Sequence, residues 1–272
     1  IILAAAGLNR LNISDRISQI IPLSQLKPPD GQGFIALTFR KGDERFYRIR
    51  SLFTPSVTFA GAGVGDKNLC TKATIDALRD CEICLYDSLM DHKLLEELPS
   101  TAEVIDVGKR CGAHSKQQQV ITDLLCERAR RGKKVVRLKG GDPGIFGRLT
   151  EETTALEELQ IAYRVIPGIS ALQAATTGTG MLLTRRDVSR GFVALTPRAA
   201  AGKLAPCDAN EKSTLPIVYY MSIKAMDHIT KELLNDGCPK NTPVAVIYNA
   251  GGLDQEIFRT ELSYLPKLGK NY

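Results

Sequence analysis

Strand-like and helix-like segments alternate along residues 57–168 of this chain, and the alternation constrains the fold more than any other feature. Short β-branched runs such as VTFAGAG (57–63) and KKVVRLKG (133–140) are each followed by a helical segment, for example TEETTALEELQ (150–160). Strands separated by helices of this length run parallel in one sheet. The sequence therefore predicts an α/β fold whose first lobe contains a mostly parallel sheet.

The pattern changes after residue 170, where helices and strands no longer alternate regularly. Two helices are expected there, at 171–180 and 223–237. Strands are expected at 191–197, 216–221, 242–250 and 255–262. We expect these segments to form a second α/β lobe with a mixed sheet. The predicted division of the chain is residues 1–54, a first lobe at 55–168 and a second lobe at 169–272.

The segment before the first lobe has a different character. Residues 1–11 have a helical pattern, and DGQGFIALTFR (30–40) ends in an alternating strand. These pieces resemble the end of the second domain of porphobilinogen deaminase (hydroxymethylbilane synthase), over about 40 residues. The resemblance implies a fusion remnant without deaminase chemistry, because the third deaminase domain and its cofactor-bearing cysteine do not follow.

Two glycine loops follow strands of the first lobe. Residues 135–148 read VVRLKGGDPGIFGR, and residues 61–66 read GAGVGD. Glycines at the end of a strand leave the backbone open to a small polar ligand. The second loop also invites a dinucleotide interpretation, since Asp87 lies 22 residues after Gly65. Its spacing is G-x-G-x-G and not G-x-G-x-x-G, and the GGDP loop has no role in such a site.

Together with LYDSL (85–89), VGKR (107–110) and IPGISA (166–171), the two loops resemble the tetrapyrrole methylase family. The resemblance implies two α/β lobes with S-adenosylmethionine in the cleft between them, and a homodimer. It implies C-methylation of uroporphyrinogen III to precorrin-2, or alternatively of a later precorrin. A dinucleotide-binding oxidoreductase and a non-catalytic scaffold are the alternatives from other classes.

The resemblance also assigns roles to individual residues. The residues that it implies for cofactor binding are Val64, Gly140, Gly141, Asp142, Ile145, Ser170, Ala171, Met221 and Ala250. For Met221 the alternative is plain packing in the core. Asp87 and Lys109 match the family's proposed proton acceptor and donor, with substrate positioning or ion pairing as the alternative. Guanidinium groups bind carboxylates in bidentate fashion, so the candidates for the substrate carboxylates are Arg110, Arg148, Arg185 and Arg186.

Composition limits the other possibilities. The chain has 272 residues, 43% of them hydrophobic, which suffices for a sizeable core. No apolar run reaches the roughly 20 residues that span a bilayer, and seven scattered cysteines suit a reducing compartment, so we expect a cytoplasmic protein. Cys81 and Cys84 form a single C-x-x-C, for which buried thiols are expected and not a metal site. The net charge of +6 is dispersed and aromatic residues are 6%, which favours a small anionic substrate over nucleic acid.

Overall fold

The computed structural model describes residues 5–21, 25, 45, 49, 56–108, 114–197 and 215–269. The chain divides into two compact units, residues 1–42 and 43–272. The first unit contains the helix α1 (Ala5–Arg10) and a 3₁₀ turn, η1 (Ser14–Arg16). This helix agrees with the one predicted for residues 1–11. The strand predicted within residues 30–40 lies outside the described residues.

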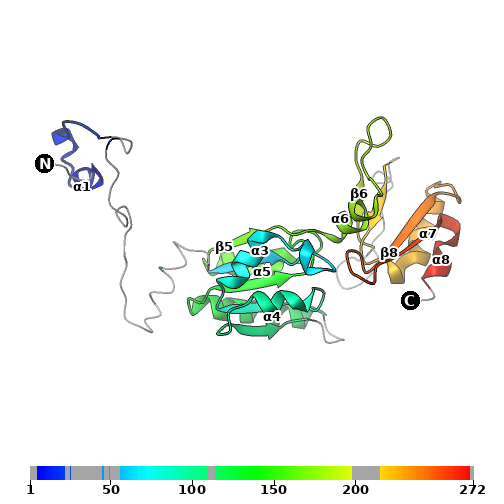
Figure 1. Cartoon of the computed structure of the whole chain (residues 1–272), viewed down its shortest axis with the longest axis horizontal. Helices are drawn as coiled ribbons and strands as arrows, with labels where there is room; N and C mark the ends of the chain where they lie inside the picture. The colour runs from blue at the N-terminus through cyan, green and yellow to red at the C-terminus, as the bar shows by residue number, and fades with distance from the viewer. Residues whose placement is uncertain are drawn as a thin grey trace. The chain divides into compact units, whose positions relative to one another are not determined.

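The first lobe of the larger unit is built on a parallel sheet, as predicted (Figure 1). Its strands are β1 (Val57–Gly61), β2 (Ile83–Tyr86), β3 (Glu103–Asp106), β4 (Val135–Lys139) and β5 (Tyr163–Ile166). They lie in the order β3-β2-β4-β1-β5, and every neighbouring pair is parallel. β4 is therefore the central strand, and the carboxyl ends of β1 and β4 lie side by side.

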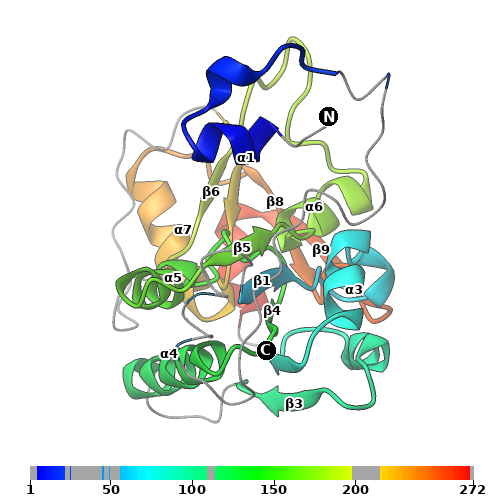
Figure 2. The ribbon, with the colours of Figure 1, turned by 90° about the vertical axis from the view of Figure 1, so that its left-hand side faces the viewer.

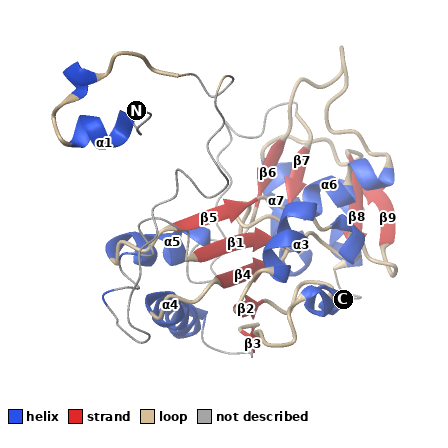
Figure 3. Ribbon diagram, turned by 60° about the vertical axis from the view of Figure 1, so that its left-hand side comes forward, coloured by secondary structure: helices blue, strands red, loops and turns tan. Residues whose placement is uncertain are grey.

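Helices connect these strands across both faces of the sheet. They are η2 (Lys67–Leu69), α3 (Lys72–Arg79), η3 (His92–Glu97), α4 (His114–Arg130) and α5 (Leu149–Glu158). The Thr71 side chain caps α3 by accepting a hydrogen bond from the Thr74 amide at 3.2 Å. Gly132, with φ of 71°, follows α4 in the left-handed conformation that is common for a glycine just after a helix. α4 and α5 lie on one side of the sheet and α3 on the other (Figure 3).

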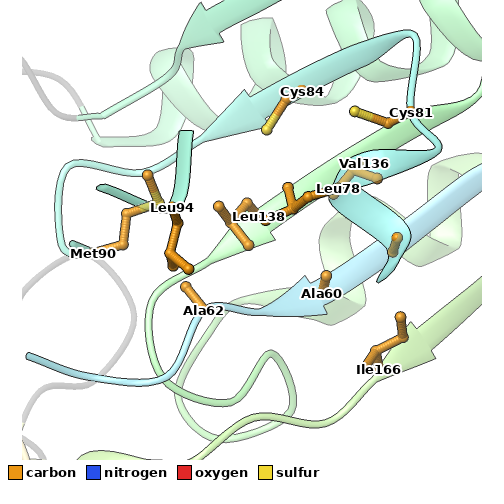
Figure 4. Close-up of a cluster of buried hydrophobic side chains, with 11 residues drawn as sticks. Ala60, Ala62, Leu78, Cys81, Cys84, Met90, Leu94, Val136, Leu138 and Ile166 are labelled. Carbon is orange, nitrogen blue, oxygen red and sulfur yellow. The ribbon is translucent and has the colours of Figure 1, made fainter. Parts of the chain in front are cut away.

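Alternate residues of each strand pack into different cores. On the α3 face, Ala60, Cys84, Val136 and Leu138 join Leu78 in one buried apolar cluster (Figure 4). On the other face, a second cluster joins strand residues to α4 and α5, and it contains Val57, Phe59, Ile83, Leu85, Leu125, Leu156 and others. Since both faces are covered, the inner strands are mostly apolar on both sides, as is usual for parallel sheets.

The second lobe contains strands of both orientations. Its elements are α6 (Ala171–Ala175), η4 (Thr177–Thr179), β6 (Val193–Leu195), β7 (Ile217–Tyr219), η7 (Ile223–Ala225), α7 (Met226–Asn235), β8 (Pro243–Tyr248), β9 (Glu256–Glu261), η8 (Leu262–Tyr264) and α8 (Leu265–Leu268). β6 and β7 are parallel, whereas β8 and β9 are antiparallel. Among the described residues they form separate two-stranded sheets, so the expected mixture of directions is divided between two sheets (Figure 2).

A small core holds α7, η8 and α8 together through Met226, Leu262 and Leu265. In the part of the chain that the structure describes, no helix combines the length and the apolar character needed to cross a membrane.

Candidate functional site

The loops that leave β1 and β4 are the centre of the candidate site. The chain goes from β1 to α3 on one face of the sheet and from β4 to α5 on the other. In open α/β sheets ligands bind where the connections after two neighbouring strands diverge in this way. Both of these loops carry the predicted glycine motifs, so the topology places the motifs at the position where a ligand is expected.

Backbone hydrogen bonds join the two glycine loops. The Gly141 amide donates to the Gly63 carbonyl at 2.7 Å, and the Gly63 amide donates to the Gly141 carbonyl at 3.3 Å. A methyl group added at Gly168 would lie only 2.2 Å from the Gly141 carbonyl oxygen. The loops after β1, β4 and β5 therefore approach one another as bare backbone, which a side chain would prevent.

Several residues predicted for cofactor binding meet at this point. A methyl group added at Gly141 would lie 3.6 Å from Val64 Cγ1 and 3.8 Å from Ser170 Cα. The neighbouring Gly140 adjoins the loop after β2, because a methyl group there would lie 2.8 Å from the Leu89 carbonyl oxygen. Three separate stretches of the sequence thus converge on the GGDP loop.

The Asp142 carboxylate organises the loop. Oδ1 accepts a hydrogen bond from the Gly144 amide at 2.8 Å, and Oδ2 accepts one from the Gly168 amide at 3.0 Å. The carboxylate therefore connects the loop after β4 to the Pro-Gly turn after β5. This geometry gives Asp142 a structural role in the site in addition to the predicted contact with a cofactor.

The second lobe contributes to the same region through the residues after β7. Tyr220 Oη shares a hydrogen bond with Ser170 Oγ at 2.5 Å and accepts one from the Leu172 amide at 3.1 Å. The centroid of the Tyr220 ring lies 4.8 Å from the centroid of the Phe146 ring. Met221 follows with φ of 54° and is 50% exposed, so the alternative that it packs in the core is wrong.

A second link between the lobes involves the turn after β8. The Asp66 amide donates to the Gly251 carbonyl at 3.1 Å, and a methyl group at Gly65 would lie 2.1 Å from the Gly251 carbonyl carbon. Ala250 is the neighbour of Gly251 and is partly exposed. The structure therefore brings the turn that contains Ala250 beside the loop that contains Val64.

Asp87 lies at the carboxyl end of β2 and is paired with an arginine. Arg137 Nη2 donates to Asp87 Oδ1 at 2.7 Å, and the Asp87 side chain is 28% exposed whereas that of Arg137 is 3% exposed. The ion pairing that the sequence left open is thus present. The Asp87 carboxylate is thus partly exposed at the carboxyl edge of the sheet, and the buried Arg137 contacts it from the interior.

Arg137 belongs to a buried cluster of charges under the GGDP loop. Glu152 of α5 is 0% exposed and accepts hydrogen bonds from Lys139 Nζ at 2.9 Å and Gln118 Nε2 at 3.1 Å. Arg137 Nε lies 3.4 Å from Glu152 Oε2. Burial, reinforced by the charge of Arg137, lowers the pKa of Lys139 from its usual range, whereas Glu152 acts in the opposite direction.

The predicted substrate-binding arginines lie in different places. Arg148 is the N-cap residue of α5, has φ of 53° and pairs with Glu151 at 2.9 Å. Arg185 and Arg186 are exposed on a turn that is closed by hydrogen bonds between Arg185 and Ser189. Lys109 and Arg110 lie outside the described residues.

The dinucleotide interpretation does not suit the GAGVGD loop at residues 61–66. In that motif the glycine loop leads directly into a helix whose N-terminus faces the pyrophosphate. Here η2 intervenes, and α3 begins at Lys72, seven residues after Gly65. The thiols of the C-x-x-C are buried as expected, since Cys81 is 5% and Cys84 0% exposed.

Sequence reasoning missed Tyr220, Arg137, Lys139 and Glu152. A signal for the charged cluster was present, because Arg137 and Lys139 interrupt a strand that is otherwise apolar. A central parallel strand is normally a continuous apolar run, so two charges in it predict a buried partner.

Comparisons with known proteins agree with this geometry. Residues 56–266 match the family model described as Tetrapyrrole (Corrin/Porphyrin) Methylases. The chain belongs to the tetrapyrrole methylase family. Residues 1–48 match the model described as Porphobilinogen deaminase, dipyromethane cofactor binding domain, which confirms the second resemblance.

Two curated relatives of this tetrapyrrole methylase illustrate the range of lengths. Siroheme synthase 1 of Aeromonas hydrophila is 40% identical over 216 residues, which are 78% of this chain and 46% of the relative. The chain thus spans about half the length of the siroheme synthases that it matches. Uroporphyrinogen-III C-methyltransferase of Methanocaldococcus jannaschii is 37% identical over 219 residues, which are 80% of this chain and 90% of that protein.

Solved structures of tetrapyrrole methylases share the fold. A cobalt precorrin-4 methyltransferase has a TM-score of 0.69 at 26% identity, covering 79% of this chain and 89% of that one. Uroporphyrin-III C-methyl transferase from Thermus thermophilus, complexed with S-adenyl homocysteine, has a TM-score of 0.68 at 32% identity, covering 78% of this chain and 90% of that one. These likenesses confirm the predicted two-lobed α/β fold.

Proposed function

We propose that the chain is an S-adenosylmethionine-dependent C-methyltransferase that converts uroporphyrinogen III to precorrin-2. The observation that carries the proposal is the pairing of Gly63 with Gly141, which assembles the family's two glycine loops at the carboxyl ends of β1 and β4. The relatives from M. jannaschii and T. thermophilus, both named for this activity, support the choice of substrate.

The residues present fit S-adenosylmethionine. Gly140 and Gly141 carry no side chains, so a ligand can approach the backbone of this loop closely. Ile145 and Phe146, each 40% exposed, and Met221, 50% exposed, provide apolar surface for the adenosine and the methionine chain. In our proposal six further residues complete the cofactor site: Val64, Gly140, Asp142, Ser170, Ala171 and Ala250. The side chains of Asp142 and Ser170 already form hydrogen bonds within the protein, so these two residues would contact the cofactor through their backbone.

S-adenosylmethionine, when bound, supplies an electrophilic methyl group. In our proposal an electron-rich pyrrole carbon would take that methyl group in line while the methyl carbon–sulfur bond breaks and S-adenosylhomocysteine leaves, so the main task of the loops is to hold the two molecules in the required orientation. A proton must then leave the pyrrole system. Asp87, a carboxylate oriented by Arg137 and partly exposed, is proposed as the acceptor. Lys109, outside the described residues, is proposed as the donor.

The substrate carries carboxylates, which arginine binds well. We propose that Arg148 contacts them, because it directly follows the GIFG segment of the loop after β4. Arg110, Arg185 and Arg186 remain proposed contacts on the strength of the family pattern. A homodimer also remains a prediction.

Two measurements test the function. Calorimetry should show one S-adenosylhomocysteine site per chain and no binding of NADPH. Incubation with uroporphyrinogen III and S-adenosylmethionine should add two methyl groups, as read by mass spectrometry of the product. Binding without methylation of any tetrapyrrole would identify a non-catalytic scaffold, and methylation only of a precorrin would identify the alternative substrate class.

The catalytic assignment is tested by Asp87→Asn and Lys109→Met. Turnover should fall by about 10²-fold or more in each, while S-adenosylhomocysteine affinity stays nearly unchanged. If activity instead follows only the folded fraction measured by thermal denaturation, both residues are structural and the assignment is wrong.

A further inference from the structure

Arg137, Lys139, Glu152 and Asp87 form a continuous chain of charges from the buried face of the sheet to its carboxyl edge. The first three are 2%, 3% and 0% exposed, and Asp87 is the member that reaches solvent. Two of the four side chains are basic and two are acidic, so their formal charges sum to zero. Buried charges are tolerated when they are compensated and hydrogen-bonded in this way.

The guanidinium of Arg137 is hydrogen-bonded at two of its three nitrogen atoms, and the third lies within ion-pair distance of Glu152 without a hydrogen bond. Nη1 donates to the Leu138 carbonyl at 3.1 Å, Nη2 donates to Asp87 at 2.7 Å, and Nε faces Glu152 at 3.4 Å. A planar group held at several points has one orientation. Asp87 therefore receives its hydrogen bond from a donor whose orientation is set by contacts on the buried side of the sheet.

The same cluster supports the GGDP loop. Lys139 is the last residue of β4 and immediately precedes Gly140. Its Nζ donates a hydrogen bond to Glu152 Oε1. A methyl group added at Gly147 would lie 3.4 Å from Lys139 Cε, so the lysine side chain runs beneath the far end of the loop. Glu152 thus contacts both Lys139, which lies beneath the loop, and Arg137.

We propose that Arg137 is a positioning residue, which fixes the Asp87 carboxylate relative to the GGDP loop through the shared partner Glu152. The inference rests on the proposed function, in which Asp87 accepts a proton from the substrate bound above that loop. It explains why a central strand of a parallel sheet carries two charged residues on one face. In this proposal Arg137 fixes the position of the Asp87 carboxylate, and Glu152 fixes the position of Arg137.

Arg137→Met and Arg137→Lys test the proposal. The methionine variant should fold, because Lys139 still neutralises Glu152 and Asp87 is partly solvated. The lysine variant keeps the charge but lacks the planar fork. In both, kcat for uroporphyrinogen III should fall at least about tenfold, with KM and S-adenosylhomocysteine affinity within about twofold of wild type, and Arg137→Lys should retain more activity than Arg137→Met.

Arg164→Met and Arg164→Lys are the matched controls, since Arg164 of β5 donates to Thr58 Oγ1 at 3.0 Å in the same sheet. Both should leave kcat unchanged. The double variant Arg137→Lys with Asp87→Asn should be no slower than Asp87→Asn alone, because Arg137 acts through Asp87.

A folded Arg137 variant with wild-type kcat, additive losses in the double variant, or a change confined to KM would overturn the inference. Failure of both Arg137 variants to fold would assign the residue a structural role and would also overturn it. Failure of the proposed function has a different signature, since the wild-type chain itself would then not bind S-adenosylhomocysteine or would not methylate the substrate.

Discussion

Tyr220, which follows β7, forms a hydrogen bond with Ser170, the N-cap residue of α6. The Ser170 amide in turn donates to Gln173 Oε1 at 3.0 Å, which completes a capping box at the start of the helix. The Tyr220 hydroxyl also accepts from the Leu172 amide. One phenol therefore satisfies a helix N-terminus and, through its ring, contacts Phe146 of the GGDP loop.

Tyr220→Phe should loosen this connection. It keeps the ring contact with Phe146 and removes the hydrogen bonds of the hydroxyl, so the free energy of unfolding should fall by about 1–2 kcal/mol in urea titrations. S-adenosylhomocysteine affinity should fall several-fold in calorimetry. Tyr264→Phe, at a 52% exposed position, is the matched control and should change neither quantity. Equal behaviour of the two variants would contradict the role of Tyr220.

Asp142→Ala should weaken S-adenosylhomocysteine binding by more than its effect on stability explains. Asp91 provides a control with the same architecture, since it accepts from the amide two residues ahead, Lys93, at 3.0 Å and from the distant Lys67 amide at 3.0 Å. Each variant should lose about 1–3 kcal/mol of unfolding free energy. Calorimetry should show a loss of affinity for Asp142→Ala alone, and equal affinities in the two variants would refute the role of Asp142 in the cofactor site.

Gly65→Ala should disturb the contact with the turn after β8. Gly65 and Gly237 both have positive φ, 69° and 84°, but an added methyl group meets Gly251 at 2.1 Å in the first case and nothing within 4 Å in the second. Gly237→Ala should cost only the backbone strain of about 1–2 kcal/mol. Gly65→Ala should cost more and should also reduce S-adenosylhomocysteine affinity, as measured by chemical denaturation and calorimetry.

The thiols of Cys81 and Cys84 should resist alkylation in the folded protein. Burial raises the pKa of Cys81 to about 11 and that of Cys84 to about 12. Both groups are therefore neutral thiols at pH 8, and the thiolate is the reactive form. Iodoacetamide labelling followed by peptide mass spectrometry should show little modification of either residue, whereas the same protein in urea should be labelled at both. Rapid labelling of the folded chain would reopen a redox role.

The order of elements in the first lobe was predictable because each buried strand is a short apolar run bounded by helical periodicity. The strand predicted at 133–140 corresponds to β4 at Val135–Lys139, for example. The short turn η3 (His92–Glu97) was not predicted, since six residues are too few to show a helical period. The second lobe was predicted as a mixed sheet, but strand direction alone does not determine which strands pair.

The glycine loops were recognisable because their chemistry depends on local spacing. Contacts between distant residues were not, since they depend on how packed elements meet. Arg137 and Glu152 are 15 residues apart, and only the packing of α5 over β4 brings their side chains together. Tyr220 and Ser170 are 50 residues apart, and only the packing of the segment after β7 against the start of α6 brings them together. Such pairs require knowledge of the tertiary arrangement.

The two faces of β4 differ in polarity along its length, and this difference has a consequence for folding. On the α4 and α5 face the residues change from Val135 to Arg137 to Lys139, whereas the α3 face presents Val136 and Leu138. If the strand shifted by one position against its neighbours, the arginine and the lysine would enter the apolar cluster around Leu78 without a carboxylate to meet them. The charges that surround Glu152 therefore also penalise misaligned sheets, and the same residues that prepare the site select the single register in which the site exists.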